Sequence, residues 1–214
     1  MFKFVLFFFL GLVQPVMANL DISALEAVSQ KYRQSAMVSM NLNQTVTSDL
    51  LGTETKSSGK VHVAQGKFRI ALSEPTKSLI VFDGDRIWNE QHPPVGIKGD
   101  VQYTSTKIDK KNRGQLLIGQ LLSKEPITKS FKITDVIKAS DSVKYTATPL
   151  VSDLVIKSLV ISVNSKSKEI LSIEYKDELD NLTKYEFSKI QFSKKLTKAL
   201  FKYVPPKNAK EVKL

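Results

Sequence analysis

The sequence predicts a mainly β protein with helices, of the α+β class, built on one strongly curved antiparallel sheet of about ten or eleven strands. Short runs that alternate apolar and polar residues recur along most of the chain. Turn residues, chiefly Gly, Pro and Asp, separate these runs. Two segments instead have the three- and four-residue apolar spacing of an amphipathic helix. Because so wide a sheet curls and must bury its apolar face, we expect the helices to cover its concave side.

The first eighteen residues have the features of a cleavable secretory signal peptide. Lys3 precedes an apolar run over 4–13, and Val16-Met17-Ala18 supplies small residues before the expected cleavage point. That run is roughly ten residues long, well short of the ~20 that a membrane-spanning helix needs. We therefore expect residues 1–18 to be removed and residues 19–214 to form a single domain that is exported to the periplasm.

The chain contains no cysteine and has a formal net charge of +11. Without cysteine it can form no disulfide and cannot carry the acylated cysteine of a lipoprotein, so we expect a soluble, unanchored protein. Its positive charge can steer it toward anionic lipid headgroups, acidic partners or nucleic acid. Nucleic acid is not expected as a partner, because the chain is exported and has no recognised binding motif.

The mature chain is expected to begin with a helix over Leu20–Ser35. Asp21 or Ser23 can cap the N-terminus of this helix. Its apolar stripe consists of Ile22, Leu25, Val28 and Tyr32. From Met37 the apolar period changes to two, so we expect a strand to follow the helix directly.

Five short strands are then expected in a meander, with a turn before each. They are KVHVA (60–64), KFRIALS (67–73), SLIVF (78–82), DRIWNE (85–90) and the segment 101–107. Asp83-Gly84, before the fourth of these, is a favoured hairpin corner. A second helix is expected over 112–122, with Leu117, Leu121 and Leu122 on one side.

Five further strands are expected in the second half of the chain. They are SFKITDVI (130–137), SVKYTATP (142–149), SLVISVN (158–164), EILSIEYKD (169–177) and TKYEFSKIQF (183–192). The alternation of the last strand slips by one residue at Ser188-Lys189, which indicates a β-bulge. An apolar segment then continues until Pro205-Pro206 ends it.

The sequence has no recognisable catalytic cluster. His62 and His92 are the only histidines and the chain has no cysteine, so no multi-histidine or zinc–cysteine site can form. We expect His62 on a sheet face and His92 at the surface of a Pro-rich loop. Neither a Gly-x-Ser-x-Gly elbow nor a Gly-x-x-x-x-Gly-Lys phosphate loop occurs. Asp83, Asp85 and the acidic group after Asp177 are expected to make turns. We therefore expect no enzyme, no catalytic residue, no metal and no cofactor.

Residues 68–88 carry more apolar side chains than the core of the sheet obviously needs. Ordinary core packing explains any single one of these side chains, so a ligand cavity requires further support. The apolar residues are Phe68, Ile70, Leu72, Leu79, Ile80, Val81, Phe82, Ile87 and Trp88. Four of them are consecutive and supply apolar side chains to both faces of one strand.

A resemblance gives that support. Four stretches carry it: GKVHVAQGKFRI (59–70), SEPTKSLIVFDGDRIW (73–88), TKYEFSKIQF (183–192) and ALFKYVPPKNAKEV (199–212). Together they resemble the periplasmic outer-membrane lipoprotein carrier family, LolA, over most of the mature chain. The most specific pieces are the apolar strand that ends in Asp83-Gly84 with Trp88 four residues on, and the closing Phe201-x-Tyr203-x-Pro-Pro.

The resemblance implies an incomplete antiparallel β-barrel with lid helices over an apolar cavity. It also implies a carrier, without enzymatic activity, that accepts acylated lipoproteins from an inner-membrane lipoprotein-releasing ABC transporter. The carrier then passes its cargo to an acceptor lipoprotein in the outer membrane. Since that acceptor begins its mature chain with an acylated cysteine, this cysteine-free chain is similar to the soluble carrier, and we expect a monomer.

The resemblance further implies which side chains bind the acyl chains. Those of the cavity and its gate are Val38, Met40, Leu42, Val61, Val63, Phe68, Ile70, Leu72, Val81, Trp88, Leu117 and Leu121, and those of the lid are Leu25, Val28 and Tyr32. The chain departs from the family at two places. Gln65-Gly66 stands where the family commonly has Arg-Pro, whose arginine holds the lid closed, and Ile70 stands at a family tryptophan.

Three other functions remain as alternatives. A LolA-like protein that carries another lipid or lipid-linked product, such as a glycolipid or a pigment ester, is the main one, because the family arginine is missing. An enzyme is a lesser one, and so is a binder of anionic polysaccharide that uses charge instead of a cavity, whose binding would weaken steeply with salt. For the carrier, we hypothesise that basic residues around Lys107 to Arg113 dock an acidic face of a partner.

Overall fold

The computed structural model describes residues 20–108, 126–150 and 156–213, where most of the regular structure is β-sheet. One helix, α1 (Ser23–Gln34), precedes the strands, and two short 3-10 helices are η2 (Ile127–Lys129) and η3 (Lys198–Phe201). The strands are β1 (Met37–Ser48), β2 (Thr53–Ala64), β3 (Lys67–Glu74), β4 (Ser78–Phe82), β5 (Arg86–Gln91), β6 (Gln102–Lys107), β7 (Phe131–Lys138), β8 (Ser142–Pro149), β9 (Ile156–Asn164), β10 (Glu169–Asp177), β11 (Leu182–Ser193) and β12 (Lys210–Glu211).

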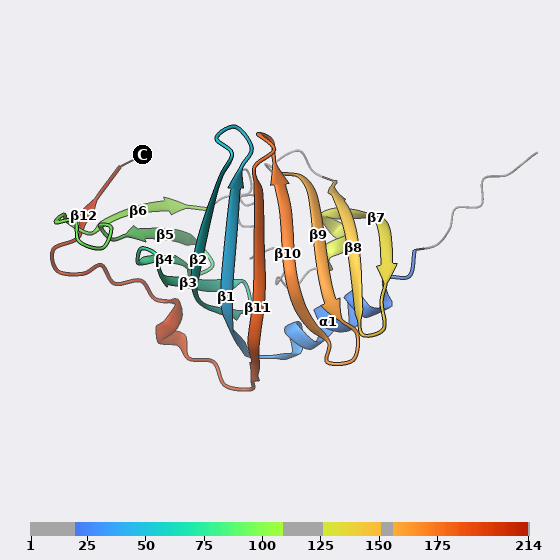
Figure 1. The fold of residues 1–214 in the computed structure, drawn as a ribbon. Coiled ribbons are helices and arrows are strands. Elements are labelled where there is room, and N and C mark those ends of the chain that lie inside the picture. The colour runs from blue at the N-terminus through green and yellow to red at the C-terminus, as the bar shows by residue number, and fades with distance from the viewer. Residues whose placement is uncertain (1–19, 109–125, 151–155, 214) are drawn as a thin grey trace, which may run out of the picture.

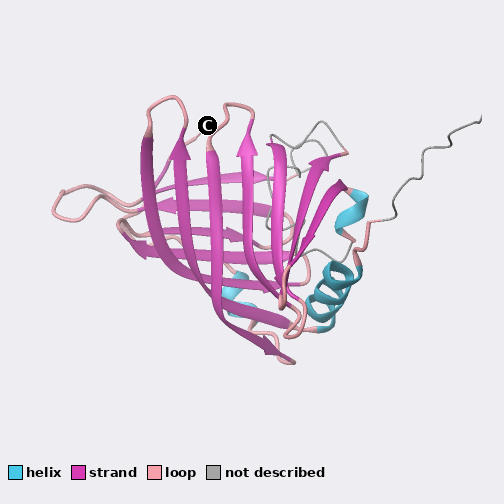
Figure 2. Cartoon of the chain, turned by 45° about the vertical axis from the view of Figure 1, so that its right-hand side comes forward, coloured by secondary structure: helices cyan, strands magenta, loops and turns pink. Residues whose placement is uncertain are grey.

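All of these strands belong to one sheet, in the order β12-β6-β5-β4-β3-β2-β1-β11-β10-β9-β8-β7. Figure 1 shows two meanders, β1 to β6 and β7 to β11, which are joined where β1 pairs with β11. The sheet curves strongly, and β7 and β12 are its two edges in the described part of the chain (Figure 2). The predicted fold class, an open, strongly curved antiparallel sheet with helical cover, is confirmed.

The predicted strands agree with the observed ones except at two places. β2 begins at Thr53 rather than at Lys60, because its polar first half pairs with β1 along the whole hairpin. β12 is not predicted, since its two residues carry no alternation. Among the strands that the structure describes, it alone runs parallel to its neighbour, β6. The predicted helix over 112–122 lies outside the described residues.

The helix α1 follows the predicted apolar stripe but begins at Ser23 rather than Leu20, and its N-cap residue is Ile22 instead of the predicted Asp21 or Ser23. Asp21 Oδ1 accepts a hydrogen bond from the Ser23 N–H at 3.0 Å, and Asp21 Oδ2 lies 2.6 Å from Lys138 Nζ on β7. These donors hold the pKa of the Asp21 carboxyl well below its usual range, the Lys138 ammonium most of all. The helix ends at Gln34, after which Ser35 has an extended backbone that leads into β1.

The predicted turn and bulge are both confirmed. Asp83 Oδ1 accepts hydrogen bonds from the backbone N–H groups of Asp85 (2.9 Å) and Arg86 (2.8 Å), so the carboxylate closes an Asx-type turn. Gly84 has φ +105° there, a conformation that side chains disfavour. On β11, Lys189 has φ +51°, and the pairing with β1 shifts between Ser39 and Asn41.

The bulge has a consequence for the faces of the sheet. Phe187 and Phe192 are an odd number of residues apart, so a regular strand would direct them to opposite faces. With the extra residue, Phe187 pairs with Leu42 and Phe192 pairs with Val38, which share one face of β1. Both aromatic side chains therefore pack with the same core as those β1 residues.

Gly59 is the position on β2 where a side chain cannot be accommodated. A Cβ atom built there would lie 2.0 Å from the backbone oxygen of Ala71 and 2.8 Å from the Cα of Leu72, both on β3. We expect Gly59→Ala to cost about 1–3 kcal/mol of unfolding free energy, because backbone atoms must move to relieve the overlap. Urea denaturation measures this cost. Thr55→Ala, an exposed change on the same strand, is the control and should stay within about 0.5 kcal/mol of the parent.

Candidate functional site

The inner, concave face of the sheet is a continuous apolar surface. Residues that pair directly across antiparallel strands share a face, so the register decides which side chains meet. Val38 pairs with Val63, which pairs with Phe68, and Met40 pairs with Val61, which pairs with Ile70. Leu42 and Leu72 both pair with Gly59 in the next row. The structure thus brings together eight of the predicted cavity residues, namely Val38, Met40, Leu42, Val61, Val63, Phe68, Ile70 and Leu72.

The second meander extends the same surface beyond β1. Phe187 continues the row of Leu42, and Tyr185 pairs with Ile173, which pairs with Ile161. Ile161 in turn pairs with Tyr145 on β8. Most of these side chains are buried and belong to one core with those of β1 to β3. Sequence reasoning did not assign these second-half residues to the site, although their strands showed the same alternation.

Two predicted cavity residues do not lie on this surface. Val81 pairs with Arg69 and Trp88, one residue out of step with the inner row that contains Phe82 and Ile87, so Val81 and Trp88 point to the outer face. There the Trp88 ring stacks on Tyr203 of the C-terminal segment, with ring centroids 5.8 Å apart. Val81 and Trp88 therefore lie outside the candidate cavity. Leu117 and Leu121 lie outside the described residues.

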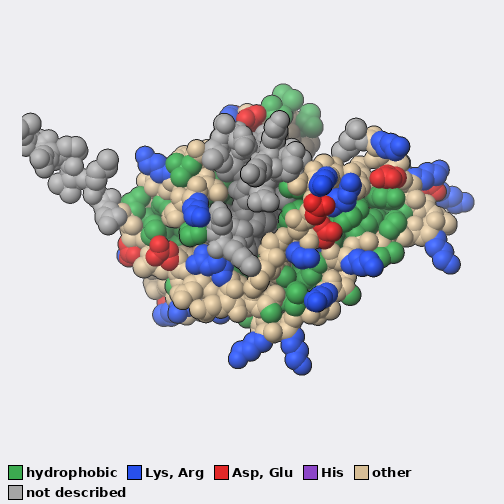
Figure 3. Space-filling model, turned by 180° about the vertical axis from the view of Figure 1, so that it is seen from behind, with side chains coloured by type: hydrophobic (Ala, Val, Ile, Leu, Met, Phe, Trp, Pro, Cys, Tyr) green, Lys and Arg blue, Asp and Glu red, His purple; other side chains and the backbone are tan. Residues whose placement is uncertain are grey.

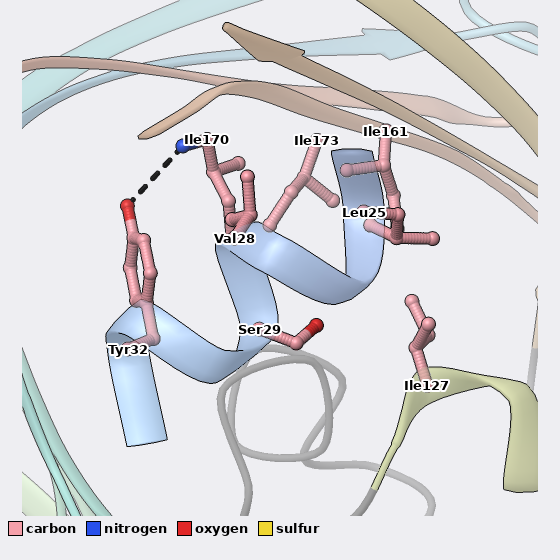
Figure 4. Close-up of a pocket in the computed structure, with 8 residues that line it drawn as sticks. All are labelled: Leu25, Val28, Ser29, Tyr32, Ile127, Ile161, Ile170 and Ile173. Atoms are coloured by element: carbon pink, nitrogen blue, oxygen red, sulfur yellow. Dashed lines mark hydrogen bonds between the residues drawn. The ribbon is translucent and has the colours of Figure 1, made fainter. Parts of the chain in front are cut away.

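The helix α1 covers the second-half portion of the inner face. The three predicted lid residues, Leu25, Val28 and Tyr32, are 3%, 1% and 7% exposed. Figure 4 shows them directed toward the isoleucines of β9 and β10, with Ile127 of η2 beside them. The space left between helix and sheet is only about 10 Å³, no more than one water molecule needs. In this structure α1 is therefore closed on the sheet, and a larger hollow of about 300 Å³ lies between α1 and η2.

Two tyrosines tie α1 to the sheet, and sequence reasoning missed this role. The Tyr145 hydroxyl accepts a hydrogen bond from the Leu25 N–H, and the Tyr32 hydroxyl accepts one from the Ile170 N–H, each at 3.3 Å. Burial raises the pKa of both phenols above the usual value, so both stay neutral at physiological pH. Gln65-Gly66, which stands where the resemblance expects Arg-Pro, lies in the turn between β2 and β3, and Gly66 has φ +69°.

The rim of α1 is held by exposed polar contacts that contribute little. Lys31 Nζ donates to the backbone oxygen of Ser167 at 2.7 Å and lies 3.9 Å from the ring centre of Phe192. Tyr32 packs edge-on against the same Phe192 ring. With the Asp21–Lys138 pair at the other end of the helix, these contacts orient α1 without locking it in place. The closure therefore depends mainly on three apolar side chains.

The outer face of β5 carries a buried polar cluster that the sequence did not predict. The Glu90 side chain, only 7% exposed, accepts a hydrogen bond from the Tyr203 hydroxyl at 2.9 Å and lies 2.8 Å from His92 Nε2. His92 is thus partly buried rather than a free surface residue. Together with the Trp88–Tyr203 stacking, this cluster fastens the C-terminal segment across β5. His62 lies on a sheet face as predicted.

The described residues offer little else for chemistry. In the ranges that the structure covers, no three His, Cys, Asp or Glu side chains are placed to hold a metal ion. No helix there is long and apolar enough to cross a membrane. Seen from behind, Lys and Arg side chains are scattered among apolar patches rather than massed (Figure 3). The apolar inner face with its helical cover is the candidate site.

Known proteins share this sequence pattern and fold. Residues 33–204 match the model of the family described as outer membrane lipoprotein carrier protein LolA. An outer-membrane lipoprotein carrier protein of Chromobacterium violaceum is 27% identical over 198 residues, which cover 92% of this chain and 89% of that protein. The one from Nitrosospira multiformis is 27% identical over 206 residues, or 95% and 94% of the two chains. An uncharacterized conserved protein from Thermus thermophilus shares the fold, with TM-score 0.51 and 10% identity over 89% of this chain and 97% of that one.

The tyrosine anchors make a prediction about α1. Tyr145→Phe keeps the ring but removes the acceptor of the Leu25 N–H, so the free energy of unfolding should fall by about 1 kcal/mol. Amide hydrogen exchange, read by mass spectrometry, should be faster at the first turn of α1. Tyr103→Phe on the outer face is the matched control and should leave that exchange unchanged. Equal exchange in the parent and Tyr145→Phe would remove the anchoring role.

Proposed function

The chain belongs to the LolA family of outer membrane lipoprotein carrier proteins, and we propose that it is a periplasmic carrier that shelters the acyl chains of lipoproteins on the inner face of its sheet. It takes this cargo from an inner-membrane lipoprotein-releasing ABC transporter and delivers it to an acceptor lipoprotein in the outer membrane. The names of the relatives support the lipoprotein cargo. The signal-like residues 1–18 support export to the periplasm.

One observation carries the proposal: the second-half portion of a continuous apolar face is covered by α1 through contacts that can separate. Cargo replaces α1 on this face, since the space between the helix and the sheet is far too small for an acyl chain. The short connection at Ser35 and Ala36 serves as the hinge. Its anchor is the Ala36 N–H, which donates to the backbone oxygen of Ser193 at 2.9 Å.

The energies favour such an exchange. Burying Leu25, Val28 and Tyr32 stabilises the closed form by roughly 5–9 kcal/mol in all. One acyl chain of ~16 carbons is worth roughly 12 kcal/mol when it leaves water. An incoming chain can therefore displace the helix and still gain free energy. Because the displaced helix remains tethered, it can return when a downstream acceptor removes the cargo.

The direction of transport comes from outside the protein. The sequence has no Gly-x-x-x-x-Gly-Lys loop to cradle a nucleotide phosphate. An upstream ATPase that loads the carrier and an acceptor of higher affinity supply the direction.

Depleting the protein in its native host should make outer-membrane lipoproteins accumulate in the inner membrane, as measured by membrane fractionation. Normal sorting after depletion would contradict the carrier role.

A second cargo class is favoured by one observation. The residue that the family uses to hold its lid is absent at Gln65-Gly66, and two tyrosines hold α1 in its place. A differently held lid suits another lipid, such as a glycolipid or a pigment ester. Mass spectrometry of material that co-purifies from the periplasm separates the two: triacylated protein supports the lipoprotein cargo, and free lipid supports the alternative.

The exchange of helix for cargo predicts opposite effects of two equal substitutions. Val28→Ala weakens only the closed form, so it should tighten binding of a triacylated lipopeptide by up to about tenfold. Val63→Ala removes the same atoms from the face that receives the acyl chain, so it should weaken binding. Fluorescence titration with a labelled lipopeptide measures both, and thermal melts establish that both variants are folded. Weaker binding by Val28→Ala would show that α1 is not displaced.

A further inference from the structure

A second hollow lies on the outer face of the sheet, on the opposite side from α1. It has a volume of about 380 Å³, the size of a small-ligand site. Its lining comes from β2, β3, β4 and the end of β5 and consists of Gly59, Lys60, Arg69, Ala71, Leu72, Ser73, Lys77, Ser78, Leu79 and His92. Gly59 and Leu72 also belong to the inner-face rows, and the functions proposed above use no other residue of this lining.

The register places positive groups around an apolar floor. Lys60 pairs with Ala71, which pairs with Leu79, so these three side chains form one row of the outer face. Arg69 is two residues from Ala71 along β3, and Lys77 is two residues from Leu79 along the chain. Residues two apart on a strand share a face, so two cations flank the floor on either side of this row. The pocket is therefore apolar at its centre and cationic at its rim.

Within the described residues, no carboxylate forms an ion pair with the cations of this rim. Lys60 and Lys77 are exposed, and no carboxylate of the described chain lies within ion-pair distance of either ammonium. Arg69 Nη1 donates only to the backbone oxygen of Leu200, at 3.4 Å. The nearest acidic group on the outer face of β5 is Glu90, which is buried and already engaged by His92 and Tyr203. The pocket thus lacks an anion.

Burial and the positive charges of the rim both lower the pKa of a neighbouring histidine. His62 pairs with Arg69 across β2 and β3, and its Nδ1 atom is buried with no hydrogen-bond partner in the described chain. Burial lowers the pKa of His62, and the charges of Arg69 and Lys60 lower it further. A positive charge is therefore unfavourable beside this rim, whereas a negative charge is favoured.

We propose that this outer-face pocket binds a phosphate-bearing lipid headgroup. The phosphate lies among Lys60, Arg69 and Lys77, and the glycerol and first methylenes lie on Ala71 and Leu79. An acidic peptide is less suitable, because β3 and β4 are paired on both edges and offer no free backbone groups for an added strand. The site is independent of the carrier function, since it lies on the other face of the sheet.

Vesicle co-sedimentation tests the proposal with the full mature protein. The probes are phosphatidylglycerol vesicles, phosphatidylcholine vesicles, inorganic phosphate as a competitor, and polyglutamate. Lys60→Glu with Lys77→Glu should weaken binding to phosphatidylglycerol vesicles by about tenfold or more, because the protein loses two cations at the site. Lys132→Glu with Lys144→Glu is the matched control: both lysines are exposed on β7 and β8, and the net charge changes equally.

The outcomes separate the possible ligands. The proposal is supported when the control loses less than about threefold and millimolar inorganic phosphate fails to compete. Equal losses in the two variants would mean diffuse attraction to the net charge and would overturn it. Competition by inorganic phosphate would assign the site to the free ion, and a selective loss of polyglutamate binding would assign it to an acidic protein. Lipopeptide binding should be unchanged in both variants, so a failure here does not touch the carrier function.

Discussion

The apolar inner face of the curved sheet is the constraint on which the rest of the structure depends. A face lined by valine, leucine, isoleucine and phenylalanine from both meanders cannot remain in water without promoting association. The joint between β1 and β11 makes this face continuous, and the bulge at Lys189 keeps the aromatic residues on both sides of it turned inward. Something apolar must therefore always cover it, whether a helix of the chain or a ligand.

The contacts that hold α1 on the inner face are of intermediate strength. Three buried side chains and two tyrosine hydroxyls keep α1 closed, while the ion pairs at its ends are exposed to solvent. A larger apolar interface would make the closed form permanent, and a smaller one would leave the face open. Reversible cover follows from this intermediate strength, since hydrocarbon of comparable area can substitute for the helix.

The two faces of the sheet are used for different purposes. Inner positions of β3 to β5 continue the apolar core, whereas outer positions hold the C-terminal segment and the cation-rimmed pocket. Alternation along each strand separates these environments although they are only one residue apart. Side chains such as Phe82 and Val81, neighbours in the chain, therefore belong to different packing units.

The sequence by itself determined the local features: the stripe of α1, the strands, the Asp83-Gly84 turn and the bulge at Lys189, because each depends on spacing or backbone preference within a few residues. Only the tertiary structure decided which face of β4 and β5 turns inward, since an alternating pattern fixes the period but not its direction, and 79–82 is apolar on both faces. It also decided that Tyr145 binds Leu25, 120 residues away along the chain, and that Glu90 binds Tyr203, 113 residues away. Only the order of the strands in the sheet brings such distant residues together.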